Sequence, residues 1–417
     1  MDFSLSEEQK QIKALVRDFC RQEIDPAEVR QRIAQTSQAR TVEEIRAAFP
    51  YDLLKKMDDV GLRQLSIPAK YGGTAPDEEP NMALVVAAEE FGYWGAGIGD
   101  IVVIPWFFVR TIAANHYVTE EQKEWFFSQY IANPIMNVAI TASEPAGATD
   151  VHLPFDDGGS RIVQVTARKE GKGWVISGDK MYSSGRAVAD MAMAVTRTDK
   201  AAPASHAMTV FWVPSDAPGV TIIPNVTTIQ ELGGNCQTHY ENVRVSEDNL
   251  VGEAGKGYSI LETLFELKYY AVAEFVGAMQ RLYEQMREFA AQRVGGGKPI
   301  IQHTSVSSKL GDVAIDLETL RGLVYRTAWE LDQMEKEGSR PLGEARKFSS
   351  IACYARMKQI SWRFCQVAAD VYGGICASVD LPWEGFLRNI FMRSSAGLTL
   401  DVELSEASRH YDNRYRV

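Results

Sequence analysis

Residues that bind metals or form disulfide frameworks are scarce in this chain of 417 residues. It has only five cysteines and six histidines, and none of them has the C-x-x-C or H-x-x-x-H spacing of a zinc or dithiol site. We therefore expect no metal centre and no disulfide framework. Scattered thiols are typical of a reducing compartment, so the sequence predicts a cytoplasmic protein.

Positive charge and long apolar runs are also lacking. The chain carries 44 Lys and Arg residues against 55 Asp and Glu residues, a formal net charge of −11. Nucleic-acid-binding proteins need a basic surface that neutralises phosphates, so the charge argues against this class. No run reaches the roughly 20 apolar residues of a membrane span, and the segment from Met1 to Gln9 lacks the basic start of a signal peptide. We expect a protein without a membrane span.

What the chain does have is a large apolar content and a clear order of patterns. Hydrophobic residues make up 45% of it, enough for several domains. Helical spacing of apolar residues begins after Ser6, which can form a capping box with Gln9, and continues to about residue 130. Short apolar runs separated by Gly, Pro and Asp follow, with a hairpin turn at 169–173, and long helical segments resume after Gly257. The sequence thus predicts an α+β fold, mostly α; a polar stretch at 30–46 has no assigned role.

Two short segments about thirty residues apart carry the strongest functional signal. Residues 143–150 form a turn rich in small and hydroxyl side chains, whose backbone N–H groups can hold a pyrophosphate. Residues 178–185 place the ring of Tyr182 and the hydroxyls of Ser183 and Ser184 after a predicted strand. A planar redox ring needs such a wall and such donors, so the two segments together predict a flavin site.

In this order, with a helical C-terminal part behind them, these segments resemble the acyl-CoA dehydrogenase family over nearly the whole chain. The family's first segment usually reads Thr-Glu-Pro-x-x-Gly-Ser-Asp, and its second has Trp-Ile-Thr after Gly-x-Lys. The resemblance implies an N-terminal helical domain (1–135), a middle antiparallel β domain (136–250) and a C-terminal four-helix bundle (251–417). It also implies bound FAD, electron transfer to an electron-transfer flavoprotein, and a homotetramer or homodimer.

The resemblance assigns FAD contacts to several residues. Ser143 and Ser184 stand where the family has hydroxyls that bind the flavin ring, and Ser in place of Thr keeps the donor. Tyr182 stands where a tryptophan usually shields the flavin, although a buried core tyrosine is the alternative. Thr149 would lie near the FAD pyrophosphate or CoA.

Two C-terminal segments carry further implied FAD contacts. Arg293, in a segment similar to the family's Arg-x-x-Phe-Gly-Lys-Pro-Ile, would reach the flavin pyrophosphate across a subunit boundary with its forked guanidinium. Gly296 replaces the family's Phe, and an ordinary helix-terminating loop is the alternative. Asp370, Gly373 and Gly374 match a Gln-x-x-Gly-Gly turn, in which glycine lets the backbone approach the cofactor.

The family's usual catalytic glutamate is missing. Counting from Arg388 places that position at Gly397, which would border the substrate. Thr399, two residues further on, would contact FAD. Some relatives carry the base near residue 267 instead, one residue before an arginine.

In this chain the count near residue 267 places Leu267 at the base and Lys268 at the arginine. A one-residue slip would make Glu266 the base, and such a slip turns a helical side chain by about 100°. Lys268 would then be a structural or CoA-side cation, and Tyr269 would lie beside the substrate.

Asp100 is the other candidate for the catalytic base. It lies in an apolar, glycine-containing run, where burying a carboxylate costs free energy unless it is paired or protonated. In the family this stretch lines the acyl pocket, and some relatives that oxidise cyclic acyl-CoA esters resemble this arrangement. A helix N-cap after Gly99 is the alternative use of the aspartate.

The resemblance and the displaced base together predict an FAD-dependent dehydrogenase of a cyclic, branched or short-chain acyl-CoA thioester. A lyase that keeps FAD but eliminates a group such as sulfinate, without net oxidation, is the alternative. A CoA-ester-binding protein without turnover is a third reading, which fits the flavin-contact residues least well.

Overall fold

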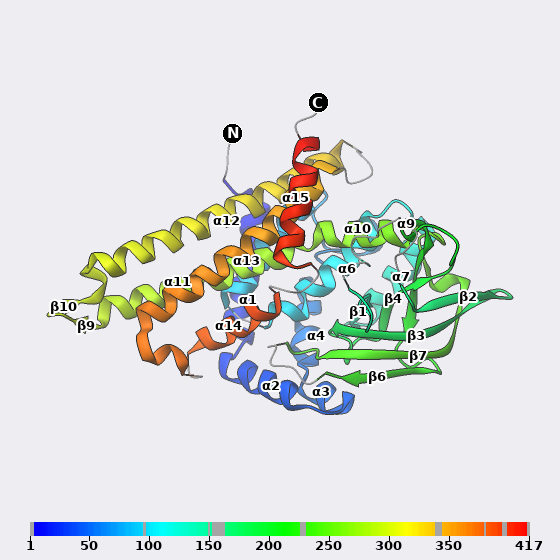
Figure 1. The fold of residues 1–417 in the computed structure, drawn as a ribbon, viewed down its shortest axis with the longest axis horizontal. Helices are drawn as coiled ribbons and strands as arrows, with labels where there is room; N and C mark the ends of the chain where they lie inside the picture. The colour runs from blue at the N-terminus through cyan, green and yellow to red at the C-terminus, as the bar shows by residue number, and fades with distance from the viewer. Residues whose placement is uncertain are drawn as a thin grey trace. The chain divides into compact units, whose positions relative to one another are not determined.

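The computed structural model describes residues 4–94, 97–148, 151, 163–225, 231–337, 344–378, 381–393 and 398–414 (Figure 1). Contacts divide the chain into two compact units, and each combines segments far apart in the sequence. Unit 1 is made of Met1–Asp25, Glu78–Gly99 and Lys268–Val417, and unit 2 is made of Pro26–Asp77 and Asp100–Leu267. The predicted order of helices, then strands, then helices is confirmed.

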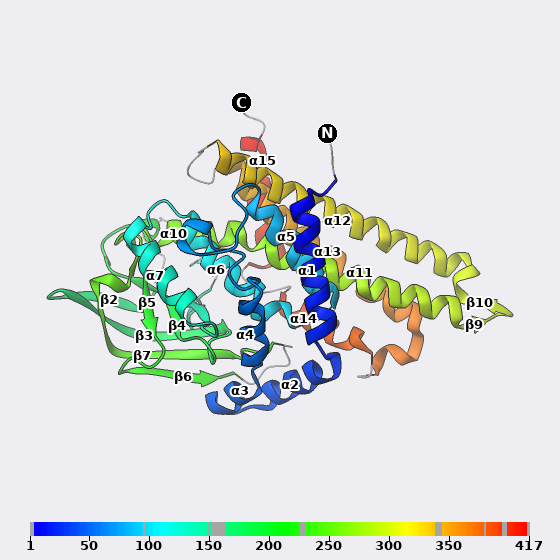
Figure 2. The same ribbon diagram turned by 180° about the vertical axis from the view of Figure 1, so that it is seen from behind.

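Unit 1 is helical. Its described α-helices are α1 (Glu7–Glu23), α5 (Pro80–Trp94), α11 (Tyr269–Gln292), α12 (Thr304–Lys336), α13 (Glu344–Tyr372), α14 (Pro382–Arg393) and α15 (Leu400–Arg414). The long helices α11, α12 and α13 run side by side, and a hairpin of β9 (Val294–Gly295) and β10 (Lys298–Pro299) follows α11 (Figure 1). α15 packs along α13, and α1 packs on α5 (Figure 2). The capping box predicted for Ser6 and Gln9 is formed at the start of α1.

Two glycines allow α5 and α11 to cross in close contact. A Cβ atom on Gly92 of α5 would lie 1.8 Å from the carbonyl oxygen of Glu274 on α11. A Cβ atom on Gly277 of α11 would lie 1.8 Å from the carbonyl oxygen of Glu89 on α5. Side chains cannot be accommodated at such distances, so backbone contact determines the register of these two helices.

α12 supplies a cap for the N-terminus of α5. The buried carboxylate of Asp332 accepts hydrogen bonds from the backbone N–H groups of Asn81 and Met82, each at 2.9 Å. These groups belong to the first turn of α5, where backbone donors lack partners within the helix. Burial raises the pKa of Asp332 to about 6, and the hydrogen bonds to Asn81 and Met82 oppose that rise.

Unit 2 is built around one sheet. Its strands are β1 (Val138–Thr141), β2 (Thr166–Glu170), β3 (Gly173–Ser184), β4 (Met191–Arg197), β5 (Met208–Pro214), β6 (Val220–Pro224), β7 (Asn235–Ser246) and β8 (Leu250–Val251). They follow the order β6-β7-β3-β2-β4-β5-β8, with β1 beside β4, and the predicted hairpin joins β2 to β3. Among the described strands, the pairings of β1 with β4 and of β2 with β4 are parallel and the others antiparallel. The predicted β domain is confirmed, but these two parallel pairings depart from a purely antiparallel sheet.

Helices α6 (Val103–Ala114), α7 (Glu120–Ala132) and α10 (Gly257–Leu267) share a hydrophobic core with the sheet. Phe126 of α7, for example, stacks on Trp212 of β5 with ring centroids 4.7 Å apart. The polar stretch 30–46 belongs to α2 (Pro26–Gln38) and α3 (Val42–Ala48), which precede α4 (Tyr51–Asp59). Over the described ranges, no helix is long and apolar enough to cross a membrane.

Candidate active site

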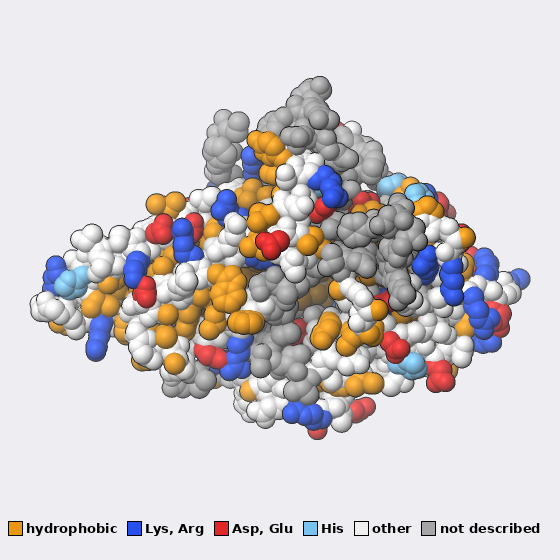
Figure 3. All heavy atoms as spheres, viewed as in Figure 1, with side chains coloured by type: hydrophobic (Ala, Val, Ile, Leu, Met, Phe, Trp, Pro, Cys, Tyr) orange, Lys and Arg blue, Asp and Glu red, His pale blue; other side chains and the backbone are white. Residues whose placement is uncertain are grey.

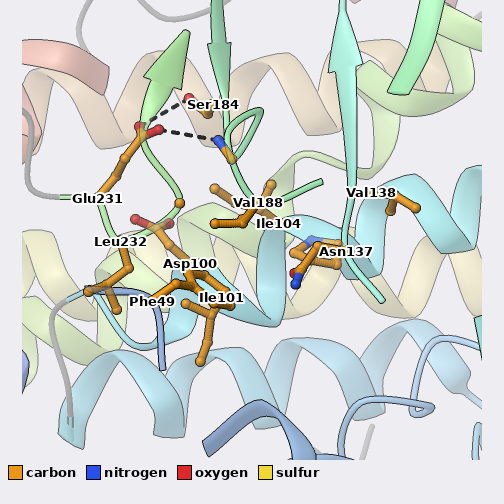
Figure 4. Close-up of a pocket in the computed structure, with 13 residues that line it drawn as sticks. Phe49, Asp100, Ile101, Ile104, Asn137, Val138, Ser184, Val188, Glu231 and Leu232 are labelled. Atoms are coloured by element: carbon orange, nitrogen blue, oxygen red, sulfur yellow. Dashed lines mark hydrogen bonds between the residues drawn. The ribbon is translucent and has the colours of Figure 1, made fainter. Parts of the chain in front are cut away.

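A pocket of unit 2 lies at the N-terminal end of α6, next to the end of β3 and the loop before β7 (Figure 4). The pocket brings together Asp100 and Ser184, which the sequence singled out for separate reasons. Asn137 and Glu231 add polar groups, and the remaining lining residues are Phe49, Ile101, Ile104, Pro105, Val138, Gly185, Val188, Leu232 and Gly233.

Asp100 lies in a short 3₁₀ helix, η2 (Gly99–Ile101), directly before α6. Its side chain is partly buried and points toward the segment of Glu231 and Leu232 (Figure 4). The N-cap residue of α6 is Val102, so the alternative in which Asp100 caps this helix is wrong. A carboxylate that lines a pocket with apolar walls is placed to accept a proton from a bound molecule.

Glu231 is a second carboxylate of this pocket, and the sequence did not predict it. It is 6% exposed. Its Oε2 accepts a hydrogen bond from Ser184 Oγ at 3.1 Å, and its Oε1 accepts one from the backbone N–H of Gly185 at 3.3 Å (Figure 4). Glu231 lies in the loop before β7, where no periodic pattern marks buried positions, so no local signal could have identified it.

The two segments predicted to form a flavin site lie side by side. The backbone N–H of Met181 donates to the carbonyl oxygen of Ser143 at 2.8 Å, and Ser143 itself is partly buried. Lys180 Nζ donates to the carbonyl oxygen of Ala142 at 3.0 Å. The last residues of β3 therefore run alongside the start of residues 143–150. Thr149 lies outside the described residues, so its role stays a prediction.

A buried ion pair joins these segments. Lys180 Nζ lies 2.7 Å from Glu144 Oε1, and the carboxylate also accepts hydrogen bonds from the backbone N–H groups of Gln164 at 2.6 Å and Val165 at 3.1 Å. Burial lowers the pKa of Lys180 to about 8, while the adjacent Glu144 carboxylate acts in the opposite direction. The pair thus connects residues 142–144, residues 164–165 and β3 at one buried point.

Tyr182 has an unusual backbone conformation for an aromatic residue. Its φ of 53° lies in the left-handed region, where a side chain costs roughly 1–3 kcal/mol. The pairing of β3 with β7 shifts register between Lys180 and Ser183, which marks a bulge. The Tyr182 side chain is 65% exposed, so the alternative of a buried core tyrosine is wrong. An exposed ring two residues before Ser184 fits the wall of a site for a planar flavin.

The second candidate base lies apart from this pocket. Glu266 is buried in the last turn of α10 and does not line the pocket that contains Asp100 and Ser184. Leu267, to which the sequence count also pointed, is buried and apolar. Gly397 lies outside the described residues, so its place beside the substrate stays a prediction.

Lys268 takes part in a buried cluster of charges within unit 1. Its Nζ lies 3.3 Å from Glu403 Oε1 and 4.1 Å from the ring centroid of Tyr354. Lys358 Nζ lies 3.0 Å from the same carboxylate oxygen. This pairing favours the structural over the CoA-side role for Lys268. Tyr269 is fully buried in the same unit, and its burial raises its pKa well above the usual range.

The C-terminal FAD contacts implied by the resemblance lie in unit 1. Arg293 is exposed at the end of α11, directly before the β9–β10 hairpin. The carboxylate of Asp370 pairs with Lys309 of α12. Gly373 has a φ of 64° at the start of the 3₁₀ helix η5 (Gly373–Ala377), a conformation that favours glycine.

A Cβ atom on Gly373 or Gly374 would meet open space within this chain. Thr399 is exposed, and its carbonyl oxygen accepts a hydrogen bond from the backbone N–H of Glu403 in the first turn of α15. The FAD roles of Arg293, Asp370 and Thr399, and of the two glycines, stay predictions.

The chain is similar to known proteins along most of its length. The sequence matches "Acyl-CoA dehydrogenase, N-terminal domain" over residues 6–133, the middle domain of the same family over 139–243 and its C-terminal domain over 255–399. It is 27% identical over 396 residues to the probable acyl-CoA dehydrogenase YngJ of Bacillus subtilis, covering 93% of this chain and 94% of that protein.

It is also 26% identical over 392 residues to the 3-(aryl)acrylate reductase of Clostridium sporogenes, covering 92% of this chain and 93% of that protein. Its fold is similar to that of butyryl-CoA dehydrogenase from Megasphaera elsdenii, with a TM-score of 0.82, 22% identity and coverage of 99% and 100%. The three family matches together span most of the sequence in the expected order. The chain belongs to the acyl-CoA dehydrogenase family, a family of FAD-dependent oxidoreductases.

Proposed function

We propose that this protein uses FAD to oxidise a cyclic, branched or short-chain acyl-CoA thioester, with Asp100 as the base. The observation that carries the proposal is that Asp100 and Ser184 line one pocket of unit 2. One of them is a carboxylate able to accept a proton, and the other is the hydroxyl assigned to the flavin. A dehydrogenase of this family needs both functions at the reacting carbon atoms.

The residues of the site would have separate roles in this reaction. The Asp100 carboxylate accepts the proton from the carbon next to the thioester carbonyl, or from one conjugated with it. Ser143, Tyr182 and Ser184 hold the flavin ring, and the Tyr182 ring covers it from water. Bound FAD supplies the acceptor for the hydride.

The walls of the pocket support a compact acyl group. The pocket has apolar sides, formed by Phe49, Ile101, Ile104, Pro105 and Val188. One relative is named as acting on an aryl acrylate, a ring-bearing acid. A ring-shaped or branched acyl group therefore agrees best with the pocket.

Two partners belong to the proposal. An electron-transfer flavoprotein would take the electrons after each turnover, and further copies of the chain would form a homodimer or homotetramer. Hydrophobic side chains gather on the face over α13 (Figure 3). In unit 1, Trp362 of α13 and Phe391 of α14 are exposed, with ring centroids 5.5 Å apart. Light scattering gives the solution mass, to be compared with the 46.4 kDa of one chain.

The test is anaerobic mixing of the purified protein with linear, branched and cyclic acyl-CoA esters while the oxidised flavin absorption is followed. Bleaching by a cyclic or branched ester is expected. Release of a fragment such as sulfinate with no electron acceptor present would instead support the lyase alternative, which the glycine at position 397 favours.

The Asp100→Asn variant tests the base. It should retain FAD yet lose most of the rate of bleaching, because the amide cannot accept the proton. Asp216→Asn, at an exposed position of the same unit, serves as the control and should bleach normally. Unchanged bleaching by Asp100→Asn would refute the assignment of the base.

A further inference from the structure

Neighbouring side chains determine which hydrogen bonds the hydroxyl of Ser184 can still form. A serine hydroxyl carries one proton and two acceptor lone pairs. A carboxylate can only accept, so the contact of 3.1 Å between Ser184 Oγ and Glu231 Oε2 uses the serine's single proton. Asn235 Nδ2 donates to the same Oγ at 3.5 Å. Ser184 Oγ can therefore only accept a hydrogen bond from a third group.

Several contacts keep Glu231 in this position. Its second oxygen accepts from the backbone N–H of Gly185, so both oxygens engage the end of β3. The following residue, Leu232, accepts a hydrogen bond through its carbonyl oxygen from Thr36 Oγ1 of α2 at 3.4 Å. A Cβ on Gly234 would lie 2.7 Å from Ile45 of α3, which shows how closely α3 packs on this loop.

The polar stretch that the sequence left without a role therefore supports the loop of Glu231. Thr36 and Ile45 both fall within residues 30–46, and both contact the loop that follows Glu231. Glu231 as a whole is 6% exposed, so little of the residue is open to solvent.

We propose that Glu231 is a positioning residue that turns Ser184 into a pure hydrogen-bond acceptor toward the flavin. The inference rests on the proposed contact between Ser184 and the flavin. A hydrogen-bond acceptor interacts favourably with a flavin ring nitrogen that carries a hydrogen, as in reduced FAD. It interacts unfavourably with a ring nitrogen that presents a lone pair, as in oxidised FAD. Through Ser184, Glu231 therefore favours reduced over oxidised FAD and raises the midpoint potential of the bound cofactor.

The test is a double-mutant cycle of Glu231→Gln and Ser184→Ala, read by the midpoint potential of bound FAD. Each protein is loaded with FAD and reduced anaerobically in the presence of a reference dye. Glu231→Gln replaces the carboxylate with an amide, which can donate to Ser184 Oγ and so frees the hydroxyl proton to point at the flavin. The substitution also removes a negative charge, and the Ser184→Ala background measures that direct effect alone.

The expected result is that the shift caused by Glu231→Gln is more negative when Ser184 is present than in the Ser184→Ala background. Ser184→Thr keeps the hydroxyl and should behave like the parent protein. Thr36→Val removes the hydrogen bond to the Leu232 carbonyl oxygen and leaves the charge of Glu231 in place. This variant should lower the midpoint potential of bound FAD by a smaller amount, and it provides the test if the double variant does not fold. Glu241→Gln, at an exposed position of β7, is the control and should leave the potential unchanged.

Equal shifts in the two backgrounds would overturn the proposal, because Glu231 would then act by its charge alone or not at all. The FAD content of the purified parent protein, measured first from its absorption, separates this failure from a failure of the proposed function. A protein that binds no FAD would refute both. A protein that binds FAD but shows no coupling would refute the role of Glu231 only.

Discussion

Lys180 Nζ and Glu144 Oε1 lie 2.7 Å apart at a point where neither side chain reaches solvent. The two partners are not equivalent. Without the lysine, the carboxylate still accepts from the backbone N–H groups of Gln164 and Val165, but without the carboxylate the ammonium loses its only acidic partner among the described residues. A buried charge that loses its partner costs far more than a surface charge does.

We therefore expect Glu144→Gln to lower the free energy of unfolding by about 3–5 kcal/mol and Lys180→Met to lower it by less. The amide of Glu144→Gln would also turn a donor toward Lys180 or toward a backbone N–H. Urea unfolding measures both. Lys169→Met, which breaks an exposed ion pair with Glu247, is the matched control and should cost about 0–1 kcal/mol. An equal cost for the two buried variants would contradict the asymmetry.

Tyr182→Gly should affect stability and FAD binding in opposite directions. Glycine adopts a φ of 53° without strain, so the FAD-free protein should become more stable, by about 1 kcal/mol. The loss of the exposed ring should weaken FAD binding at the same time. Thermal unfolding of the FAD-free protein and titration with FAD give the two numbers. A loss of stability without FAD would mean that the ring contributes to the core, against its exposure.

Gly277→Ala should destabilise the protein by about 1–3 kcal/mol or more, because its Cβ would meet the carbonyl oxygen of Glu89 at 1.8 Å. Gly322→Ala on α12 is the control, since a Cβ there meets open space. The control should be stabilising by about 0.5–1 kcal/mol, because alanine is the better helix former. Opposite signs in denaturant unfolding are expected, and two variants of similar stability would show that α5 and α11 can move apart.

Asp332 should make stability depend on pH between about 4 and 6. Its pKa is raised from 3.8 to about 6, so the folded chain holds this proton more tightly than the unfolded chain does. The contribution of the group to the free energy of unfolding is therefore largest below pH 4 and falls as the pH rises to 6, by about 3 kcal/mol in total.

The Asp332→Asn variant isolates this effect, since an amide does not titrate in that range. The difference in free energy of unfolding between the parent and the variant should change between pH 4 and pH 6.5 and stay constant above that. A difference that is flat throughout would contradict the raised pKa.

The sequence predicted the helical and strand regions well because their apolar spacing is a local property. The capping box of Ser6 and the hairpin at 169–173 depend on a few neighbouring residues, and both are formed. The parallel pairing of β1 with β4 joins residues about fifty positions apart, and no local pattern encodes it. The association of α1 and α5 with the C-terminal helices is likewise a long-range feature.

The candidate site shows the same division. Asp100 stood out because an acid in an apolar run is unusual, and Ser184 because it belongs to a recognisable segment. Glu231 is an ordinary glutamate in a loop, and only the folded chain places it against Ser184. Glu266, a candidate base only if the count near residue 267 slips by one residue, does not line the pocket of Asp100.

The close crossing of α5 and α11 also has a consequence for protein synthesis. A ribosome releases α5 nearly two hundred residues before Gly277 of α11, the residue against which its backbone must rest. All of the residues that form unit 2 emerge before unit 1 can be completed. The largely apolar α5 therefore lacks the α11 surface that buries it until that helix has been synthesised, and apolar surface exposed in this way favours aggregation of an incomplete chain.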